Sequence, residues 1–297
     1  MKYELDFLGM NEEGKDADAI CFRFYDDSLQ RYVVGVYDGG FQKYGEILKD
    51  HLNQYYFNTS TSPYIDFVIC SHPDQDHASG LTEILKNFSV GQLYMNRPWT
   101  FIDELYPKIS DGRITEHSLE DRLREAYPYI NQLEELALDR GIPIYDAFQG
   151  TKIYEKLTIL SPSKEFYIDL LVESEKTPLS ETSNANLFKR LANAVQTAIE
   201  TWTGELLREN VSTTAENETS IVLLGDMGEE LFLLTGDAGI RSLKQAIDVA
   251  PEYGYKLTDV KVYQIPHHGG RHNVSPSVLD SLVGSKIGDS ESPTKTA

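Results

Sequence analysis

The feature that most constrains this chain is an apolar run that stops abruptly at a cluster of metal-ligating residue types. The run covers residues 64–70, and Ser71-His72-Pro73-Asp74-Gln75-Asp76-His77 follows it directly. Two imidazoles and two carboxylates form a donor set that suits Zn²⁺ and, with more carboxylate, Mn²⁺ or Fe. A buried strand that ends at such a cluster delivers several ligands to one point. The plainer alternative is a solvated turn rich in Asp and His.

Strands and helices alternate in the first hundred residues, which predicts an α/β fold. Apolar runs at 3–8, 19–25 and 31–37 predict three strands, and helical spacing predicts a helix over 44–55. After the run at 64–70, a second helix is expected to begin at Leu81. Alternation of this kind indicates a sheet with helices on its outer faces. The second helix would begin facing the cluster, where its N-terminus favours an anionic substrate group.

Two later strands also end in polar motifs. The strand predicted at 230–234 leads into Thr235-Gly236-Asp237, and the strand at 260–266 leads into His267-His268-Gly269-Gly270. Four of the seven histidines fall in the strand-end motifs, namely His72, His77, His267 and His268. Core packing does not explain that concentration. Asp237 has an alternative role as the N-cap of a helix predicted at 240–249.

Composition narrows the class of function. The formal net charge is −20, with a pI near 4.7, so the chain lacks the basic footprint of strong, non-specific nucleic-acid binding. Cys21 and Cys70 both lie in apolar runs, which predicts buried reduced thiols in a cytoplasmic protein. The N-terminus has no signal pattern, and no apolar run approaches the roughly 20 residues that span a bilayer. We therefore expect no membrane association.

Taken together, the motifs resemble those of the metallo-β-lactamase superfamily. The pattern from His72 to His77 is similar to the superfamily signature His-x-His-x-Asp-His, with Asp74 where the second His usually stands. The form Ser-His-Pro-Asp-x-Asp-His, the strand ending Leu-Thr-Gly-Asp at Asp237 and the His-His-Gly loop resemble the ComEC-like branch, best known as a domain of DNA-uptake proteins. Gly270 takes the place of the Ser that follows this loop in that branch. The resemblance implies a four-layer αββα metallo-β-lactamase fold in a single domain, residues 1–297.

The resemblance also implies a site for two divalent metal ions, Zn or Mn, with Fe as a further option. The first ion would be held by His72, Asp74 and Asp237. The second would be held by Asp76, His77, Asp237 and one of His267 and His268. The Asp237 carboxylate would bridge the ions. Asp76 would orient the nucleophile, and the histidine of the pair that does not bind metal would line the pocket or act on the leaving group, so these three residues are the candidate catalytic groups.

Three further residues are expected to support the site or contact substrate. Asp38, in Asp38-Gly39-Gly40 at the end of an early strand, would hydrogen-bond the metal loop. Ser161 ends the strand at 157–160, where ComEC-like sequences often carry a His ligand, so Ser161 or solvent would fill a gap at the first ion. Arg97 is a candidate contact for a substrate anion, with a plain surface arginine as the alternative.

Two helical insertions are expected, at about 99–140 and 165–215, and the second contains a helix predicted at 184–208. Each insertion would form a lid or an interface with a second copy or a protein partner. ComEC-like domains usually continue with another strand and a His-containing loop that closes the pocket, and this sequence lacks that closing segment.

The resulting hypothesis is a metallo-hydrolase that activates water to cleave a phosphodiester, either nucleic acid or nucleotide. The acidic composition favours a short or small anionic substrate over long duplex DNA. An ester, thioester or lactam hydrolase acting through the same metals is the rival enzyme. A catalytically weak sensor or scaffold is the rival from another class, for which Ser161 and the insertions argue.

Overall fold

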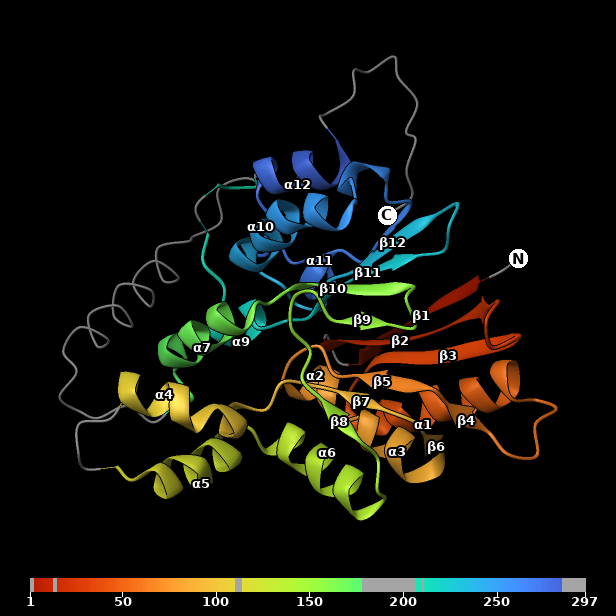
Figure 1. Ribbon diagram of the computed structural model, residues 1–297, viewed down its shortest axis with the longest axis horizontal. Helices are drawn as coiled ribbons and strands as arrows, with labels where there is room; N and C mark the ends of the chain where they lie inside the picture. Colours follow the sequence, from red (N-terminus) through yellow and green to blue (C-terminus); the bar gives the residue numbers. More distant parts are fainter. Residues whose placement is uncertain (1–2, 13–14, 110–113, 178–206, 210, 285–297) are drawn as a thin grey trace.

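The computed structural model describes residues 3–12, 15–109, 114–177, 207–209 and 211–284. Two β-sheets pack face to face, and helices cover the outer face of each sheet (Figure 1). The strand order is β1-β2-β3-β5-β7-β8 in the larger sheet and β13-β12-β11-β10-β9 in the smaller one, and β4 pairs with β6 alone. This four-layer arrangement confirms the fold class that the sequence predicts.

The predicted strands of the larger sheet form, with one interruption. At Asp66 the apolar run divides into two strands, because the Asp66 carboxylate turns back to accept hydrogen bonds from Val34 N at 2.9 Å and from the Arg31 guanidinium at 2.6 Å. The strands of this half of the molecule are β1 (Tyr3–Glu12), β2 (Lys15–Asp26), β3 (Arg31–Gly39), β4 (Tyr64–Ile65), β5 (Phe67–Ile69), β6 (Ser89–Val90), β7 (Leu93–Tyr94) and β8 (Ile144–Tyr145).

The smaller sheet is built from a hairpin and its neighbours. Its strands are β9 (Lys152–Ile153), β10 (Leu157–Ser161), β11 (Val222–Asp226), β12 (Leu231–Leu234) and β13 (Val262–Tyr263). Strand β13 is shorter than the predicted 260–266, because the chain turns into a short helix at Pro266. Proline is favoured at a first helical position, where its missing N–H costs nothing.

The helices follow the order that the sequence indicates, with two differences. A short helix already begins at Gln75, inside the polar motif and ahead of the predicted start at Leu81. A helix over 164–173 opens the second predicted helical insertion, in which the sequence specified a helix only at 184–208. The helical elements are α1 (Gln42–His51), the π-helix η1 (Leu52–Tyr56), α2 (Gln75–Ala78), α3 (Leu81–Asn87), η2 (Pro98–Phe101), α4 (Ile102–Ile109), α5 (Glu116–Ala126), α6 (Pro128–Asp139), α7 (Lys164–Glu173), α9 (Ala215–Glu218), α10 (Ile240–Val249), η3 (Ala250–Tyr253), η4 (Leu257–Asp259), α11 (Pro266–Gly269) and α12 (Pro276–Val283).

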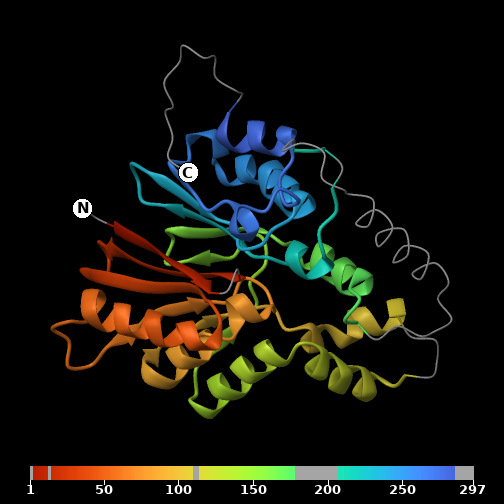
Figure 2. The same cartoon turned by 180° about the vertical axis from the view of Figure 1, so that it is seen from behind.

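Alternation of apolar side chains along the strands builds three buried clusters. On β2, Phe22 and Phe24 face the smaller sheet, whereas Cys21 faces the helices. The central cluster lies between the sheets, where Phe22 contacts Phe67 and Phe232 edge-on. One of the other two clusters joins the larger sheet to α1, α3, α5 and α6, and the other joins the smaller sheet to α10 and α12. These two groups of helices lie on opposite sides of the molecule (Figure 2).

Strand direction brings the polar motifs to one edge of both sheets. Strands β3, β5, β7 and β8 run parallel, so their carboxyl ends lie at the same edge. In the smaller sheet, β10, β12 and β13 also share one direction. Ligands of α/β sheets bind outside the carboxyl ends of the strands. The expected place for a site is therefore where these two sets of strand ends meet.

A close backbone contact fixes the polar loop beside β3. A Cβ added to Gly80 would lie 1.9 Å from the carbonyl oxygen of Gly39, so neither backbone could approach the other if residue 80 carried a side chain. Gly80 N also donates a hydrogen bond of 2.8 Å to Gly40 O. Residues 71–80 are thus held against the end of β3, where Asp38 lies.

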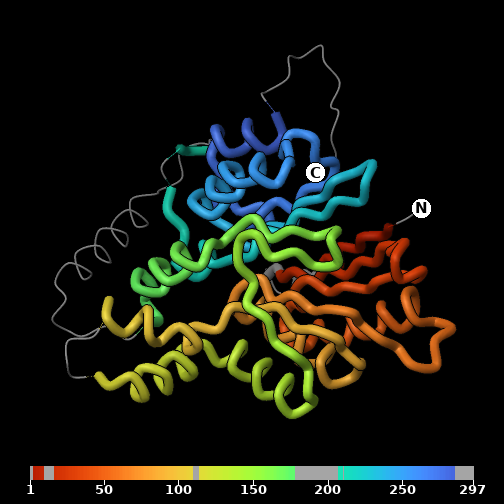
Figure 3. Tube along the Cα trace, in the orientation of Figure 1, coloured from red at the N-terminus to blue at the C-terminus, as the bar shows by residue number. Residues whose placement is uncertain are grey.

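The first predicted insertion folds as helices α4, α5 and α6, and α4, α5 and α7 gather at one end of the sheets (Figure 3). Most of the second insertion, including almost all of the helix predicted at 184–208, lies outside the described residues. Within the described ranges, no helix has the length and apolar character needed to cross a membrane.

A buried carboxylate anchors α6 to the loop after β7. Glu134 accepts hydrogen bonds from Arg97 at 2.7 Å, from the Trp99 indole at 2.9 Å and from Arg124. Burial raises the pKa of Glu134, but these three donors outweigh it and hold the pKa below the usual value of 4.5. The ionised carboxylate therefore stabilises the folded state.

We predict that Glu134→Gln lowers the free energy of unfolding at pH 7 by about 1.5–3 kcal/mol, the range for hydrogen bonds to charged groups. A folded-state pKa below 4.5 means that the contribution is complete above pH 4.5 and is lost as the pH falls through the folded value. Urea unfolding of both proteins from pH 7 down to pH 3 should therefore show the difference shrinking below pH 4.5. A difference that stays constant would contradict this assignment.

Candidate metal centre

The seven predicted metal ligands meet at the shared edge of the two sheets. His72, Asp74, Asp76 and His77 come from the segment after β5, while Asp237 follows β12, and His267 and His268 lie in α11. Each of the seven has a side-chain nitrogen or oxygen within 3.9 Å of such an atom in another member of the set. Residues up to 196 positions apart in the sequence are thus brought to one place.

Asp237 stands at the centre of the cluster. Its Oδ1 lies 3.1 Å from His77 Nε2, and its Oδ2 lies 3.9 Å from His72 Nε2 and bonds to His267 Nδ1. Gly236, with φ 51°, turns the chain so that Asp237 points back between the sheets. Asp237 does not act as the N-cap, because Gly239 holds the N-cap position of α10. One carboxylate therefore faces imidazoles from both halves of the molecule.

Asp38 holds the polar loop in place, as the sequence predicts for a supporting group. The fully buried carboxylate accepts hydrogen bonds from Ser71 N at 2.7 Å and Ser71 Oγ at 2.6 Å, and it lies 2.8 Å from His77 Nδ1. Asp38 has φ 60°, a left-handed conformation that Asp tolerates better than most residues. With His77 Nδ1 bonded to Asp38, His77 Nε2 is left to face Asp237.

The cluster contains buried ligand atoms that make no hydrogen bond, although they lie close to charged groups of the same cluster. In the part of the chain that the structure describes, six buried side-chain nitrogen or oxygen atoms have no hydrogen-bond partner, and four of them belong to this cluster. These four atoms are His72 Nε2, His77 Nε2, His268 Nε2 and Asp237 Oδ1. A buried polar atom without a partner costs about 1–3 kcal/mol. Imidazole nitrogens and carboxylate oxygens aimed at one point fit a divalent cation, which would satisfy all of them together.

The electrostatics of the metal-free cluster are those of carboxylates and imidazoles that stabilise one another. Burial and the neighbouring His77 lower the pKa of His72. Burial also lowers the pKa of His77, but the carboxylates of Asp237 and Asp38 outweigh it and hold the pKa well above its usual range. Burial raises the pKa of Asp237, whereas the charge of His77 and the hydrogen bond from His267 pull it far below its ordinary value. In this arrangement protons occupy the place that a cation would take.

Asp18, which was not predicted from the sequence, reaches the cluster from β2. Asp18 Oδ1 lies 3.1 Å from His268 Nδ1, and Asp18 Oδ2 accepts a hydrogen bond of 2.7 Å from Gln264 Nε2. Burial lowers the pKa of His268, but the contacts with Asp18 and Asp76 raise it to about 10. The signal that could have revealed Asp18 is a carboxylate placed directly before the apolar run at 19–25, in a strand that runs through the sheet.

The two histidines of α11 differ in their surroundings. Both have φ 53°, which directs their side chains away from the normal helical positions. His268 is largely buried, with Nδ1 held by Asp18 and Nε2 lying 3.5 Å from Asp76. The His267 side chain is 46% exposed, and its Nδ1 contacts Asp237 and, at 3.2 Å, the amide of Asn217. His268 therefore directs a buried nitrogen into the cluster, whereas His267 lies half exposed at the pocket wall.

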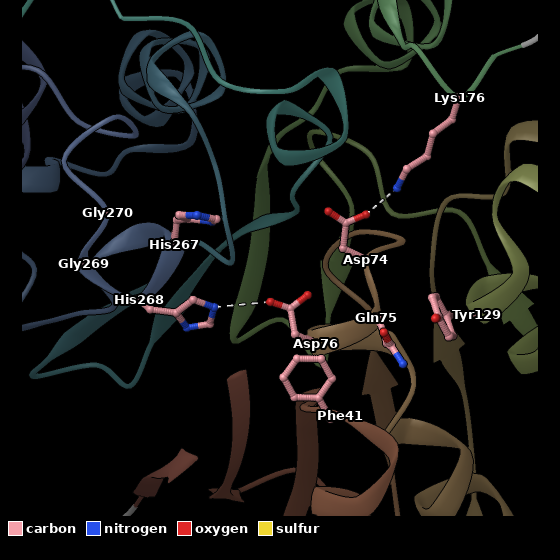
Figure 4. A pocket seen from close by; sticks show the side chains of 10 residues that line it. All are labelled: Phe41, Asp74, Gln75, Asp76, Tyr129, Lys176, His267, His268, Gly269 and Gly270. Carbon is pink, nitrogen blue, oxygen red and sulfur yellow. Dashed lines mark hydrogen bonds and ion pairs between the residues drawn. The ribbon is translucent and has the colours of Figure 1, made fainter. Parts of the chain in front are cut away.

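A pocket of about 700 Å³ opens over the cluster (Figure 4). Its walls include Asp74, Asp76 and the histidine pair, together with Phe41, Gln75, Tyr129, Lys176, Gly269 and Gly270. Lys176 lies on the side of the pocket away from the histidine pair, where its Nζ forms an ion pair with Asp74 Oδ1 at 2.6 Å. Among the described lining residues, Lys176 is the sole lysine or arginine, and sequence reasoning gave no indication of it.

Ser161 and Arg97 are placed differently from the other predicted site residues. Ser161 Oγ forms hydrogen bonds with Ser242 Oγ at 2.8 Å and with Gln245 Oε1 at 3.1 Å. Both partners lie on α10, away from the cluster. Arg97 is paired with Glu134, as described above, and lies 3.8 Å from Asp146. Neither residue lines the pocket over the cluster. Their roles as support or substrate contacts remain predictions that these contacts do not favour.

No family model and no curated protein matches this sequence. Among solved structures, the chain is similar to a β-lactamase domain protein from Burkholderia ambifaria, with a TM-score of 0.38 and 12% identity over 87% of this chain and 64% of that one. It is also similar to a metallo-β-lactamase from Hirschia baltica, with a TM-score of 0.32 and 11% identity over 84% of this chain and 80% of that one. The chain thus spans just under two thirds of the length of the Burkholderia protein. Similarity at this level carries no argument about function.

We predict that Asp38→Asn weakens the site without removing any predicted ligand. The amide cannot accept from all three donors, so at least one hydrogen bond to a charged acceptor is lost, at a cost of about 1.5–3 kcal/mol in the free energy of unfolding. Loss of the group that orients a ligating histidine typically reduces metal affinity by about 10–100-fold. Zn²⁺ titration and thermal unfolding measure the two effects. Asp169→Asn, a surface change of the same kind, is the control, and equal Zn²⁺ affinity in both variants would refute the supporting role.

Proposed function

We propose that this chain is a metal-dependent hydrolase of the metallo-β-lactamase superfamily, in its ComEC-like branch, and that it uses two divalent ions. One observation carries the proposal, namely the convergence, beneath an open pocket, of imidazole and carboxylate atoms from both sheets that make no hydrogen bond. The sequence motifs that resemble the superfamily signature supply these same residues. The geometry of the cluster and the sequence motifs therefore support the same reading.

Under this proposal Asp237 would serve as a ligand to both ions. His72 and Asp74 would complete one ion's protein ligands, and Asp76, His77 and His268 the other's. We assign His268 rather than His267 because its Nδ1 is anchored by a carboxylate and its buried Nε2 faces the cluster. Carboxylate–histidine support of this kind is usual at metal centres. Divalent ions held there would supply Lewis acidity, and they would make water acidic enough to act as a nucleophile near neutral pH.

The chain's own groups would position substrate and move protons. His267 lines the pocket and contacts Asp237 through Nδ1. Its Nε2 takes no part in that contact, so this nitrogen would be available to exchange a proton with a leaving group. Asp76 lies at the pocket wall and would orient the attacking water. Burial raises the pKa of Asp76, but the contact with His268, whose Nε2 lies 3.5 Å away, and the neighbouring imidazoles lower it, so this carboxylate is ionised at neutral pH.

We propose a small or short phosphodiester, either nucleic acid or nucleotide, as the substrate. Lys176 supports this choice, because an ammonium group on the wall facing the metal ligands suits an anionic substrate group. The ammonium group pairs with Asp74 here, and it would be free to pair with substrate once Asp74 served as a metal ligand. The formal charge of −20 argues against long duplex DNA.

We predict that the metal-free protein, reconstituted with Zn²⁺ or Mn²⁺, binds about two ions per chain, as binuclear hydrolases do. Asp237→Asn should bind about one ion or fewer and lose hydrolysis of bis(p-nitrophenyl) phosphate. Its neutral amide can neither serve as a ligand to two ions nor balance their positive charge. Elemental analysis and an absorbance assay measure both. Asp169→Asn should behave as wild type. A wild-type protein that binds almost no metal would favour the sensor or scaffold, and turnover by Asp237→Asn would defeat the mechanism.

We predict that Lys176→Met lowers kcat/KM for bis(p-nitrophenyl) phosphate by about 10–100-fold, the equivalent of one lost hydrogen bond to a charged group. The neutral ester p-nitrophenyl acetate should be affected less than threefold. Lys176→Arg should recover most of the phosphodiester activity, and Lys108→Met, which removes an exposed lysine paired with Asp169, is the matched control. Equal losses on both substrates would exclude recognition of the anion by Lys176 and would favour the ester hydrolase.

A further inference from the structure

A second group of metal-ligating atoms lies between the first two strands and α1, outside the pocket. Asp6 and Cys21 are directly opposite each other in the antiparallel register of β1 and β2, so their side chains emerge on the same face of the sheet. His51, the last residue of α1, packs over them from the helix layer. One ligand atom from each of the three residues lies within 4.8 Å of the other two.

The three residues offer different donor atoms. Asp6 supplies oxygen, His51 nitrogen and Cys21 sulfur, and none of them lines the pocket over the first cluster. Calcium and magnesium prefer oxygen alone, whereas a combination of thiolate, imidazole and carboxylate is characteristic of zinc. The side chains of His51 and Asp6 are 20% and 29% exposed, so a cation can enter from solvent, while Cys21 lies beneath them and is fully buried.

Neighbouring groups already orient these ligands. Tyr56 OH donates to Asp6 Oδ2 at 3.0 Å and to the Cys21 carbonyl at 3.2 Å, and His51 Nε2 lies 2.8 Å from the same Asp6 oxygen. Tyr56 ends the π-helix η1, which begins directly after His51. Segments of π-helix are rare and occur frequently at functional sites. This segment keeps Tyr56 in reach of the carboxylate while His51 faces the sheet.

We propose that Asp6, Cys21 and His51 form a separate binding site for one zinc-like divalent cation, which fastens α1 to the β1–β2 hairpin. The cation takes the place of the proton between His51 and Asp6 and displaces the proton of the Cys21 thiol into solvent. A thiolate and a carboxylate together then balance the charge of the ion. Arg23, whose guanidinium lies 4.8 Å from the Tyr56 ring, is already neutralised by Glu4 at 2.6 Å.

Without metal, the thiol of Cys21 is held as a neutral group. Burial raises its pKa to about 12, in spite of the hydrogen bond from Tyr56. A cation that binds here must therefore release a proton, and its affinity must increase with pH over the neutral range. This site differs in chemistry from the first cluster, whose predicted ligands include no sulfur.

Cobalt(II) provides the test, because a thiolate bound to Co²⁺ gives an intense near-ultraviolet charge-transfer band that imidazole and carboxylate ligands do not give. The full chain, stripped of metal under reducing conditions, is titrated with Co²⁺. We expect the band to appear and to saturate at about one thiolate-bound ion per chain. Addition of Zn²⁺ should abolish it. Absence of the band in the wild-type chain overturns the proposal.

The chain has two cysteines, so substitution of each one in turn identifies the residue that supplies the thiolate. Cys21→Ser should lose the band, and His51→Gln, which leaves the buried thiol in place, should weaken Co²⁺ binding at this site at least tenfold. Cys70→Ser is the matched control and should keep the band. Should Cys70→Ser remove it instead, the thiolate belongs to the residue beside His72 and the proposal fails. The Asp237→Asn variant should also keep the band, so the result is independent of the proposed hydrolase.

Discussion

The structure of this site depends on the buried carboxylate of Asp38. Three donors from the polar loop converge on it, and no water is needed to satisfy them. Since the carboxylate lies at the end of a central strand, it transfers the rigidity of the larger sheet to the loop that follows the next strand. The ring orientation of His77 is set by this contact. The imidazole can then present its other nitrogen to the smaller sheet only at the position where Asp237 lies.

Asp237 makes the complementary connection. It belongs to the smaller sheet, yet its closest polar neighbours include an imidazole from the larger one. A carboxylate buried between two layers is costly unless it is paired. The imidazoles of both sheets provide that pairing, so the electrostatics of the site and the packing of the two halves are coupled. A change that moves one sheet relative to the other would separate these charges.

Much of this arrangement could be predicted because its residues lie in short local motifs. The segment from His72 to His77, the turn before Asp237 and the histidine pair each follow an apolar strand, and parallel strands bring such ends together. Asp18 could not be predicted in the same way, since its partner His268 is 250 residues away and its only local signal is its place directly before the apolar run at 19–25.

The residues that prediction placed least well depend on tertiary contacts. Lys176 enters the pocket from beyond α7, a helix that the sequence did not specify within the second insertion, because an apolar stripe was less evident there than in α5 or α6. Ser161 ends β10 and Arg97 follows β7 by three residues, but the Ser161 hydroxyl bonds to residues of α10 and the Arg97 guanidinium to Glu134. Strand ends fix where a backbone goes, whereas competition among nearby charges and hydroxyls decides where a side chain points.

The distance in sequence between Asp18 and His268 has a consequence for the order in which the parts of the candidate site come together. The first strands leave the ribosome early and can pair locally, and the loop from His72 to His77 can dock on Asp38 soon afterwards. The cluster stays open until α11 has been synthesised and has packed against β2. A nascent chain therefore carries half a site for most of its synthesis. Contacts of such long range also form late in folding. The full set of candidate ligands is thus complete only when both sheets are assembled.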